Sequence, residues 1–416
     1  MSNKNKLILV ESEMKGPKGH FLDNLIETTK TFEKKLNISW LLNSHFDSEG
    51  TYIPNNIKIF KCISSNVFNR KKNKFLYLIE ETYLFFLNIF QIFYMSFYFI
   101  KKNNLFDYCI ALKSNYFLLP KYFFSFYKRY EMLNLSKNDH IFFQTARRKD
   151  IALINFLTKI DKDHPKFHIR VMLPPKIKFK GFFYFLREID KALKEKRAFI
   201  YLWSDHNYKL FLRNSISKKG ICKSNIPWSF YKRNLKTKNH VIGFVGDARK
   251  ARGFHHLPEI IKILEKKKYF FSYLIQFSKI SDNLLYTRDE LYKLSKNNKN
   301  IKIIEKYCDY KEFRNILKKI DIMPIVHNSN EINKVTSGTM YSCTSNEIPL
   351  VIPSGTLFMN KVLKHRSFEK AKNLSEFADK LIKISKKYNF YLNNVKKNSN
   401  ILKNILKDDP LKINII

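Results

Sequence analysis

Short apolar segments alternate with helically spaced apolar residues along the first half of the chain. Lys6–Val10 (KLILV) has the composition of a buried strand, and a loop separates it from Phe21–Leu36, where apolar residues recur on one helical face. The same half holds further strand candidates at Ile38–Leu42, Ile57–Lys61, Tyr108–Leu112, Ile141–Phe143, His168–Met172 and Ala198–Trp203. The order strand, loop, helix, strand predicts a doubly wound α/β domain.

The second half repeats this alternation with greater regularity. It opens on the apolar run Val241–Val245, and Leu257–Lys267 follows with helical spacing. Further strands are predicted at Phe271–Gln276, Ile301–Ile304, Asp321–Val326 and Leu350–Ile352, with helices near Leu285–Leu294, at Tyr310–Ile320 and from about Ser337. Strands that alternate with helices build a parallel sheet, so this half predicts a second Rossmann-like domain.

The pattern breaks between the two halves, around Pro227. The stretch Trp228–Asn239 is basic and has neither helical nor strand periodicity, which is typical of an inter-domain linker. We therefore predict an α/β protein with two doubly wound Rossmann-like domains that face each other across a cleft. The domains are expected over residues 1–227 and 240–390, followed by a helical tail over residues 391–416.

The charge of the chain narrows the choice of partners. Its 416 residues include 77 Lys and Arg against 36 Asp and Glu, a formal net charge of +41. Such an excess attracts nucleic acid, acidic membranes or phosphate-bearing substrates. A general drift of composition toward lysine, whose charge is solvated, explains the excess as well. The chain has no RNA-binding sheet motif and no helix-turn-helix pattern, so nucleic acid is not an expected partner.

Cysteine usage and the N-terminal sequence indicate a cytoplasmic protein. The five cysteines are dispersed without a C-x-x-C pair, which argues against zinc ribbons and disulfide frameworks. The apolar run Leu7–Val10 is too short for the apolar region of a signal peptide.

Two aromatic segments of the first half favour contact with a membrane. Thr82–Ile100 carries no charged residue, although Asn88 and Gln91 interrupt it, and Lys176–Lys196 mixes lysines with phenylalanines. Basic and aromatic residues together are typical of a helix that lies on anionic lipid. Burial of both segments in a protein core is one alternative. Thr82–Ile100 is also just long enough to span a bilayer, which is the other alternative for that segment. We expect peripheral attachment, if any, at the cytoplasmic face of the inner membrane.

Glycine is rare in this chain, with ten residues, so its positions are informative. Glycine is the residue for positive φ and for close approach of the backbone to a ligand. Ordinary turns explain any single glycine equally well. Three groups nevertheless fall at junctions of predicted strands and helices: Gly16 and Gly19; Gly243, Gly246 and Gly253; Gly338 and Gly355.

The segment Val241–Phe254 reads VIGFVGDARKARGF and has the composition of a diphosphate site. A strand runs into a glycine turn, and a helix begins after Gly253. Backbone N–H groups at such a turn and the helix dipole favour an anion. Arg249 and Arg252 add guanidinium groups suited to bidentate contacts with phosphate. The Walker and dinucleotide spacings are both absent, and a basic surface turn is the alternative.

This segment also carries a family resemblance. The stretch VGDARKARGFHHLPEII resembles the opening of the second domain of family 4-like bacterial glycosyltransferases of the GT-B fold. Asp321–Pro324 (DIMP) resembles the family's strand that ends in proline, and Thr336–Thr356 (TSGTMYSCTSNEIPLVIPSGT) resembles its Ser-Gly helix start and following strand. The likeness is good over Val241–Thr356 and weak over the first domain.

The resemblance implies the site and the reaction. Arg249 and Arg252, the latter where the family has Lys, would stabilise the diphosphate of a nucleotide-sugar donor as catalytic groups. The loop Gly16–His20 would meet the acceptor, a glycan or a lipid-linked glycan, through Gly19 and His20. No cofactor or metal is expected, since no metal-ligand cluster is visible in the sequence. The remaining donor-binding residues would be Gly246, Gly253, Ser337, Gly338, Thr339 and Ser342.

One departure bears on catalysis. The family carries a Glu that holds the donor ribose at the position of Ser342, and its other frequent Glu falls on Lys334. We therefore consider two functions: a hexosyltransferase, with retention favoured by the resemblance, in surface polysaccharide assembly, and a non-catalytic GT-B-fold binding protein in glycan assembly.

Overall fold

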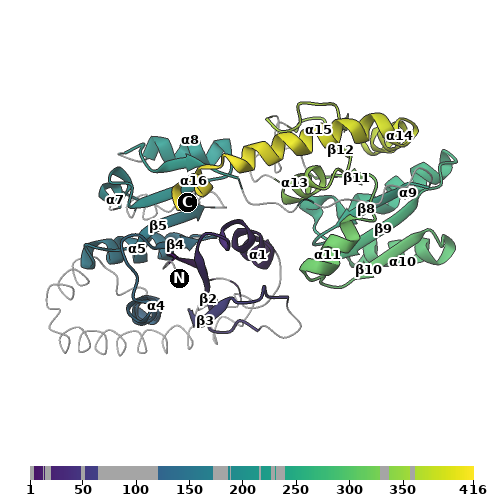
Figure 1. Ribbon diagram of the computed structural model, residues 1–416. Coiled ribbons are helices and arrows are strands. Elements are labelled where there is room, and N and C mark those ends of the chain that lie inside the picture. Colours follow the sequence, from purple (N-terminus) through teal and green to yellow (C-terminus); the bar gives the residue numbers. More distant parts are fainter. Residues whose placement is uncertain are drawn as a thin grey trace. The chain divides into compact units, whose positions relative to one another are not determined.

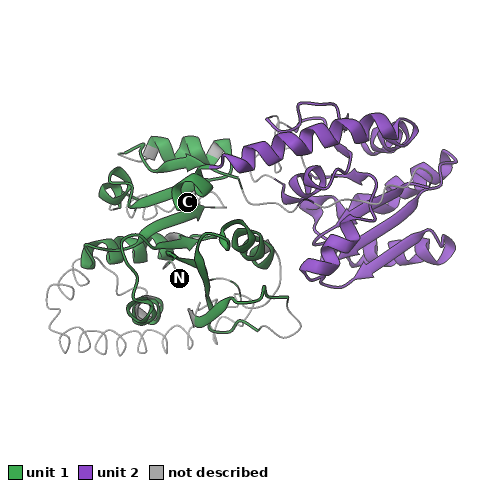
Figure 2. Cartoon of the chain, in the orientation of Figure 1, with its two compact units in different colours: residues 1–226, 410–416 green, residues 227–409 purple. Residues whose placement is uncertain are grey.

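The chain forms two compact units, shown in Figure 2. Unit 1 comprises residues 1–226 and 410–416, and unit 2 comprises residues 227–409. The computed structural model describes residues 4–12, 14, 20–47, 52–63, 120–171, 186–187, 189–214, 217–225, 230, 239–327, 337–356 and 361–416. The predicted strand Tyr108–Leu112, the segment Thr82–Ile100, Gly16 and Gly19, and most of Lys176–Lys196 and Trp228–Asn239 lie outside the described residues.

Unit 1 contains one parallel sheet of the doubly wound type (Figure 1). Its strand order is β3-β2-β1-β4-β5-β6-β7. The strands are β1 (Lys6–Glu11), β2 (Asn37–Asn43), β3 (Lys58–Ile63), β4 (His140–Phe143), β5 (Lys166–Val171), β6 (Ala198–Leu202) and β7 (Ile221–Lys223). The helices are α1 (His20–Phe32), α4 (Pro120–Leu133), α5 (Arg148–Ile160), α7 (Asp190–Lys194), α8 (Asp205–Asn214) and α16 (Pro410–Ile415).

Alternating side chains of this sheet build the core of unit 1. Ile141, Phe143 and Ile169 point to one face and pack with Phe126 of α4 and Ile154 of α5. All these side chains are buried. The strand pattern read from the sequence is confirmed for every strand that lies in the described residues, while the short β7 was not predicted.

Unit 2 contains the second doubly wound sheet. Its strands are β8 (Val241–Val245), β9 (Ser272–Phe277), β10 (Ile301–Glu305), β11 (Met323–Pro324), β12 (Leu350–Pro353) and β13 (Phe368–Ala371). β8, β9 and β10 lie side by side in Figure 1, and β11, β12 and β13 form a second ladder. A parallel bridge between Ile242 and Ile322 joins the ladders, so the order is β10-β9-β8-β11-β12-β13. The prediction of two Rossmann-like domains is confirmed; that they face a cleft stays a prediction.

The helices of unit 2 start at recognisable signals. The Asp309 side chain caps α11 by accepting from the Glu312 backbone amide at 2.7 Å. The Glu312 carboxylate in turn accepts from the Asp309 backbone amide at 3.2 Å. Pro258 lies in the first turn of α9, where a backbone N–H has no partner within the helix, so its absence removes no hydrogen bond. The helical elements are the 3₁₀ turns η2 (Lys250–Arg252), η3 (Phe254–His256) and η4 (Asp282–Leu284), then α9 (Leu257–Lys266), α10 (Leu285–Asn297), α11 (Tyr310–Leu317), α13 (Gly338–Ser345), α14 (Leu374–Lys386) and α15 (Tyr388–Lys407).

The C-terminal residues differ from the single tail that we predicted over 391–416. Tyr391 and Val395 of α15 pack into the core of unit 2. Leu411 and Ile415 of α16 are buried as well, and α16 belongs to unit 1. Both helices present an apolar face, and helical spacing alone does not tell which core that face joins.

Candidate functional site

The candidate donor segment lies at the point of unit 2 where the strand order reverses. β8 and β11 are neighbours, yet β9 and β10 separate them in the sequence. In open doubly wound sheets, ligands bind at the carboxyl ends of the two strands at this switch point. Residues 246–254 follow β8, and Val326 and His327 follow β11. The topology therefore brings the predicted glycine turn to the edge where a ligand is expected.

Two glycines of the β8 segment are required by their surroundings. A Cβ on Gly243 would lie 2.4 Å from the Ile320 side chain, since β8 passes close to the chain before β11. Gly246 has φ of 116°, and a Cβ there would lie 2.2 Å from Nη1 of Arg252. Gly246 therefore lets a guanidinium approach the backbone, the role that we predicted for a phosphate.

The amide of Gly246 is already used within the protein. It donates to the backbone carbonyl of Gln276 at 3.2 Å and to the Gln276 side-chain oxygen at 3.1 Å. The Gln276 amide in turn donates to the carbonyl of Lys306 at 2.9 Å. The N–H of Gly246 is thus directed to β9 and is used within the sheet.

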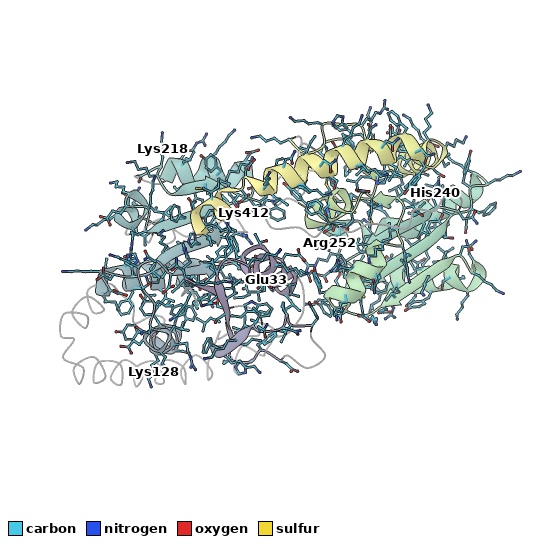
Figure 3. The ribbon with its side chains drawn as sticks, viewed as in Figure 1. Glu33, Lys128, Lys218, His240, Arg252 and Lys412 are labelled. Carbon is cyan, nitrogen blue, oxygen red and sulfur yellow. The ribbon has the colours of Figure 1, made fainter. Side chains whose placement is uncertain are left out.

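Arg252 is the better-placed of the two predicted arginines. Its side chain is half-buried beside Gly246, and Figure 3 labels it among the side chains of unit 2. Burial lowers the pKa of the guanidinium, Asp247 opposes that shift, and Arg249 adds to it. A cation held in a partly desolvated position interacts more strongly with an incoming anion than a fully solvated one. Lys128 and Lys218 of unit 1, by contrast, are exposed (Figure 3).

Arg249 is engaged by a carboxylate that the sequence analysis did not single out. Its side chain is 59% exposed and forms an ion pair with Asp247. The other oxygen of Asp247 accepts from the Ser278 hydroxyl at 3.3 Å. A phosphate that binds Arg249 has to compete with this carboxylate. Asp247 was missed because nothing in the spacing D-A-R shows that the two side chains meet.

Gly253 joins the turn to the end of β11. Its φ is 72°, and a Cβ would lie 2.0 Å from the carbonyl oxygen of Val326. The next residue, Phe254, is fully buried and packs edge-on against Phe277, with ring centroids 5.0 Å apart. These contacts hold the end of the turn against the sheet, while Arg249 and Lys250 are exposed. The diphosphate site therefore stays a prediction beside the alternative of a basic surface turn.

His327 lies in the loop that follows β11 and was not among the predicted residues. Burial, and then the charge of Arg252, lower the pKa of its imidazole to about 4. The imidazole is therefore neutral at pH 7 and close enough to sense Arg252. The sequence did not point to His327, because a single histidine after an apolar run is unremarkable and its neighbour Arg252 comes from the turn after β8.

The predicted donor residues around Ser337 occupy the start of α13. The Ser337 hydroxyl accepts from the Met340 amide at 3.4 Å and caps the helix. Gly338, Thr339 and Ser342 are half-buried on its first turns. The carbonyl of Ser342 accepts from the Asn346 side chain at 2.6 Å. α13 connects β11 to β12, so its N-terminus belongs to the carboxyl edge of the same sheet. Lys334 lies outside the described residues.

The predicted acceptor residues are described only in part. Gly19 lies outside the described residues, and His20 begins α1 without a described side chain. Unit 1 has its own switch point between β1 and β4. Polar side chains that the sequence did not reveal are buried there. One is Gln144, whose side-chain amide has no hydrogen-bond partner among the described residues.

Solved structures with the same fold share little sequence with this chain. Sucrose-phosphate synthase from Thermosynechococcus elongatus matches with a TM-score of 0.58 at 9% identity, over 97% of this chain and 95% of that one. Anabaena Alr3699/HepE, solved with UDP and glucose, matches with 0.57 at 11% identity over 97% of each chain. A glycosyltransferase from Rickettsia africae ESF-5 gives 0.54 at 14% identity over 98% and 100%. The chain has the GT-B fold.

Sequence comparison adds no closer relative. No family model and no curated protein matches the chain. The predicted GT-B fold is confirmed by the structural neighbours, whereas membership of family 4 and the roles of the site residues stay predictions. Within the described residues, no group of three or more His, Cys, Asp or Glu is arranged to hold a metal. No helix in that part of the chain has the length and apolar character needed to cross a bilayer.

Proposed function

We propose that this chain is a glycosyltransferase that moves a hexosyl group from a nucleoside-diphosphate sugar to a glycan or lipid-linked acceptor in surface polysaccharide assembly. The half-buried guanidinium of Arg252, seated on Gly246 at the switch point of unit 2, carries the proposal. Whole-chain structural neighbours are glycosyltransferases, and one of them was solved with UDP and glucose. A lipopolysaccharide outer core galactosyltransferase matches with a TM-score of 0.50.

The proposed chemistry needs charge stabilisation more than acid–base groups. As the bond from the anomeric carbon to the diphosphate breaks, negative charge develops on the leaving diphosphate. Arg252 and the N-terminus of α13 would stabilise this charge, and Arg249 would join them on release from Asp247. The acceptor oxygen then bonds to the anomeric carbon with retention, and the hydroxyl proton passes to the leaving diphosphate. We propose that the reaction needs no metal, because the guanidinium groups and the N-terminus of α13 would supply the positive charge. The Asp-x-Asp spacing Asp161–Asp163 lies in unit 1, directly after α5.

A nucleotide-binding experiment tests the donor site. Thermal unfolding of the full chain is followed with UDP, GDP and ADP. The parent should be stabilised by at least one of them, and Arg249→Ala with Arg252→Ala should abolish the effect. Loss of one charge-assisted contact should weaken binding by about ten- to hundredfold, more for Arg252→Gln than for Arg249→Gln. Arg213→Gln, on α8 of unit 1, is the matched control. Undiminished binding by the double variant would refute the assignment.

Ser342 favours a second function, a non-catalytic GT-B-fold protein that binds glycan-assembly components. A hydroxyl replaces the carboxylate that the resemblance places on the ribose. Ser342→Glu should tighten binding of a ribonucleoside diphosphate if the missing carboxylate weakens the site. Incubation with UDP-glucose and detection of released UDP separates the functions, because a binding protein releases none with any acceptor.

We also propose that the protein works in the cytoplasm, attached peripherally to the anionic face of the inner membrane. The net charge of +41 and the aromatic, basic stretch Lys176–Lys196 support this location. Sedimentation with vesicles should show binding to anionic vesicles that weakens with salt, and weaker binding to neutral ones. Equal, salt-insensitive binding to both would contradict it.

A further inference from the structure

A hollow of about 770 Å³ lies within unit 2, apart from the side chains predicted to hold the donor. Its walls come from the turns η2 and η3, from the ends of β11, β12 and β13, and from the start of α14. Lys250 and Ala251 line it, whereas Arg252 of the same turn packs on Gly246 instead. The volume falls in the range of about 300–1,000 Å³ that small organic ligands occupy, and exceeds the need of a single inorganic ion.

The hollow is electropositive. Lys250 and Lys372 contribute ammonium groups from two different loops, and none of the described residues that line it carries a carboxylate. The 13-residue helix α14 starts at its wall, where Asn373 caps the helix by accepting from the Glu376 amide at 2.9 Å. The positive end of the helix dipole therefore adds to the two cations. Together they favour a dianionic group over a monoanionic or neutral one.

Three imidazoles line the same space. His255, His256 and His327 come from η3 and from the end of β11, and the rings of His255 and His256 lie 3.7 Å apart. His255 and His256 are both half-buried. Burial lowers the pKa of all three. In the neutral form each ring offers one donor and one acceptor, the pair that a hydroxyl group matches.

One of these rings has an unused polar atom. Nδ1 of His255 is buried and has no hydrogen-bond partner among the described residues. A buried polar atom without a partner costs free energy, which a ligand hydroxyl in the hollow would recover. The floor is apolar, formed by buried residues such as Val326, Ala371 and Phe377. A carbon skeleton can therefore lie on the floor while its hydroxyls face the imidazoles.

We propose that this hollow binds a phosphate monoester of a sugar, as a site separate from the donor diphosphate. Lys250, Lys372 and the N-terminus of α14 hold the dianionic phosphate. The imidazoles of His255, His256 and His327 bind sugar hydroxyls. The proposal goes beyond the donor site and does not depend on it, because neither lysine is a predicted donor residue. It places a phosphorylated sugar on unit 2 whether or not the protein transfers a hexosyl group.

Calorimetric titration of the full chain with glucose 6-phosphate, inorganic phosphate and glucose tests the proposal. Glucose 6-phosphate should bind more tightly than inorganic phosphate, and glucose should show no binding. Lys250→Gln with Lys372→Gln should lower the affinity for glucose 6-phosphate by about tenfold or more. Lys266→Gln, an exposed lysine at the other end of α9, is the matched control and should leave the affinity unchanged.

The imidazoles are tested separately from the cations. His255→Phe keeps an aromatic ring but removes both nitrogen atoms, so it should reduce the preference for glucose 6-phosphate over inorganic phosphate without weakening inorganic phosphate. Three outcomes would overturn the proposal: parent-like binding by the double lysine variant, an equal loss in Lys266→Gln, or no preference for the sugar ester in the parent. Arg252→Gln should weaken UDP and spare glucose 6-phosphate, which distinguishes failure of this site from failure of the donor site.

Discussion

At the scale of single residues, Gly246 shows how one missing side chain positions a functional group. Its φ is 116°, and a Cβ would lie only 2.2 Å from Nη1 of Arg252. An alanine therefore does not fit at this position unless Arg252 moves. The far end of an arginine can move, so Gly246→Ala should displace the guanidinium instead of unfolding the unit. The strained backbone should cost about 1–3 kcal/mol of stability. Nucleoside-diphosphate affinity should fall as far as it does in Arg252→Gln.

A double-mutant cycle checks this mechanism. If Gly246→Ala acts through Arg252, the loss of nucleotide affinity in the double variant should equal that of either single variant. Additive losses would show that the glycine serves binding in another way. Thermal unfolding of each variant, measured without nucleotide, separates the cost to stability from the cost to binding.

Residue-scale prediction from sequence succeeded for backbone roles and failed for side-chain partners. The backbone role of the turn glycines was found because they directly follow an apolar strand in the sequence, and the role of Arg252 stays a prediction. Asp247 and His327 were missed because their contacts depend on how the turn folds and on which strand lies beside it. The contact between Gln276 and the Gly246 amide was missed for the same reason, since Gln276 reaches it from β9.

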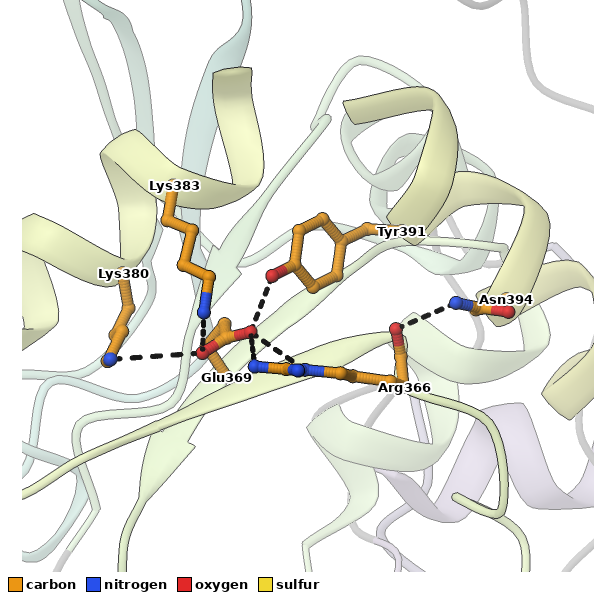
Figure 4. A network of polar contacts seen from close by, with 6 residues as sticks. All are labelled: Arg366, Glu369, Lys380, Lys383, Tyr391 and Asn394. Carbon is orange, nitrogen blue, oxygen red and sulfur yellow. Dashed lines mark hydrogen bonds and ion pairs between the residues drawn. The ribbon is translucent and has the colours of Figure 1, made fainter. Parts of the chain in front are cut away.

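At the scale of elements, one buried carboxylate joins β13 to the two helices after it. Glu369 is 5% exposed and receives bonds from Tyr391, from Lys383 at 3.1 Å and from Arg366 at 2.8 Å (Figure 4). Burial raises the pKa of this carboxyl, but the hydrogen bonds from Tyr391, Lys383 and Arg366 together outweigh burial and hold the pKa below its usual range. The ionised form is thus the one that links strand and helices.

Glu369→Gln should therefore destabilise unit 2, by about 1–3 kcal/mol in chemical denaturation. The control is Asp379→Asn on helix α14, which removes an exposed ion pair with Lys267 and should change stability little. Since the folded pKa of Glu369 is depressed, its contribution is present above the unfolded value of about 4.3 and is lost as pH falls through the folded value. Equal effects of the two substitutions at pH 7 would contradict the buried network.

A second element-scale feature is a polar chain across β4, β5 and β6. His140 Nδ1 lies 2.9 Å from His168 Nε2, and His168 Nδ1 lies 2.9 Å from the Tyr201 hydroxyl. Burial, then the Lys166 charge, lower the pKa of His140 to about 4, whereas the nearby Asp139 raises it. Burial, then the charges of His140 and Lys166, hold the pKa of His168 well below its usual value. Both rings are neutral in the folded protein at pH 7.

This chain makes unit 1 sensitive to acid. The folded pKa values lie below the unfolded value of about 6.5, so the unfolded state binds more protons and stability falls as pH drops from 6.5 toward 4. Each histidine should contribute a slope of up to about 1.4 kcal/mol per pH unit. His140→Asn should reduce the slope of denaturation free energy against pH, and the exposed His45→Asn should not. An unchanged slope in His140→Asn would refute the role of the pair.

Element boundaries were predicted well where periodicity was long and poorly where strands were short. α9, α10 and the strands β8 to β10 were found close to their final positions. β7 and β13 were missed, because three or four residues leave no room for an alternating pattern. β11 is limited to Met323–Pro324, which pair with Leu350 and Val351, whereas β12 continues to Pro353.

At the scale of the whole molecule, the chain enters unit 2 after Ile226 and returns to unit 1 at Pro410. The return adds Leu411 and Ile415 to unit 1, both buried, and Asn414 donates to the Tyr201 hydroxyl at 3.2 Å. The last seven residues are thus part of the first unit's fold although they follow the whole of the second. Sequence patterns did not reveal this, because the periodicity of a short amphipathic helix does not indicate which unit its apolar face packs against.

Deletion of residues 410–416 should consequently destabilise unit 1 and spare unit 2. Burial of two large aliphatic side chains contributes about 3–6 kcal/mol, so their loss should lower the protection of β4 to β6 in hydrogen exchange. Protection of β8 to β10 should stay the same. Leu411→Ala should reproduce part of the loss, and Ile413→Ala, on the same helix but 65% exposed, should not. Equal loss of protection in both units would show that they unfold together, and no loss in unit 1 would show that α16 does not stabilise it.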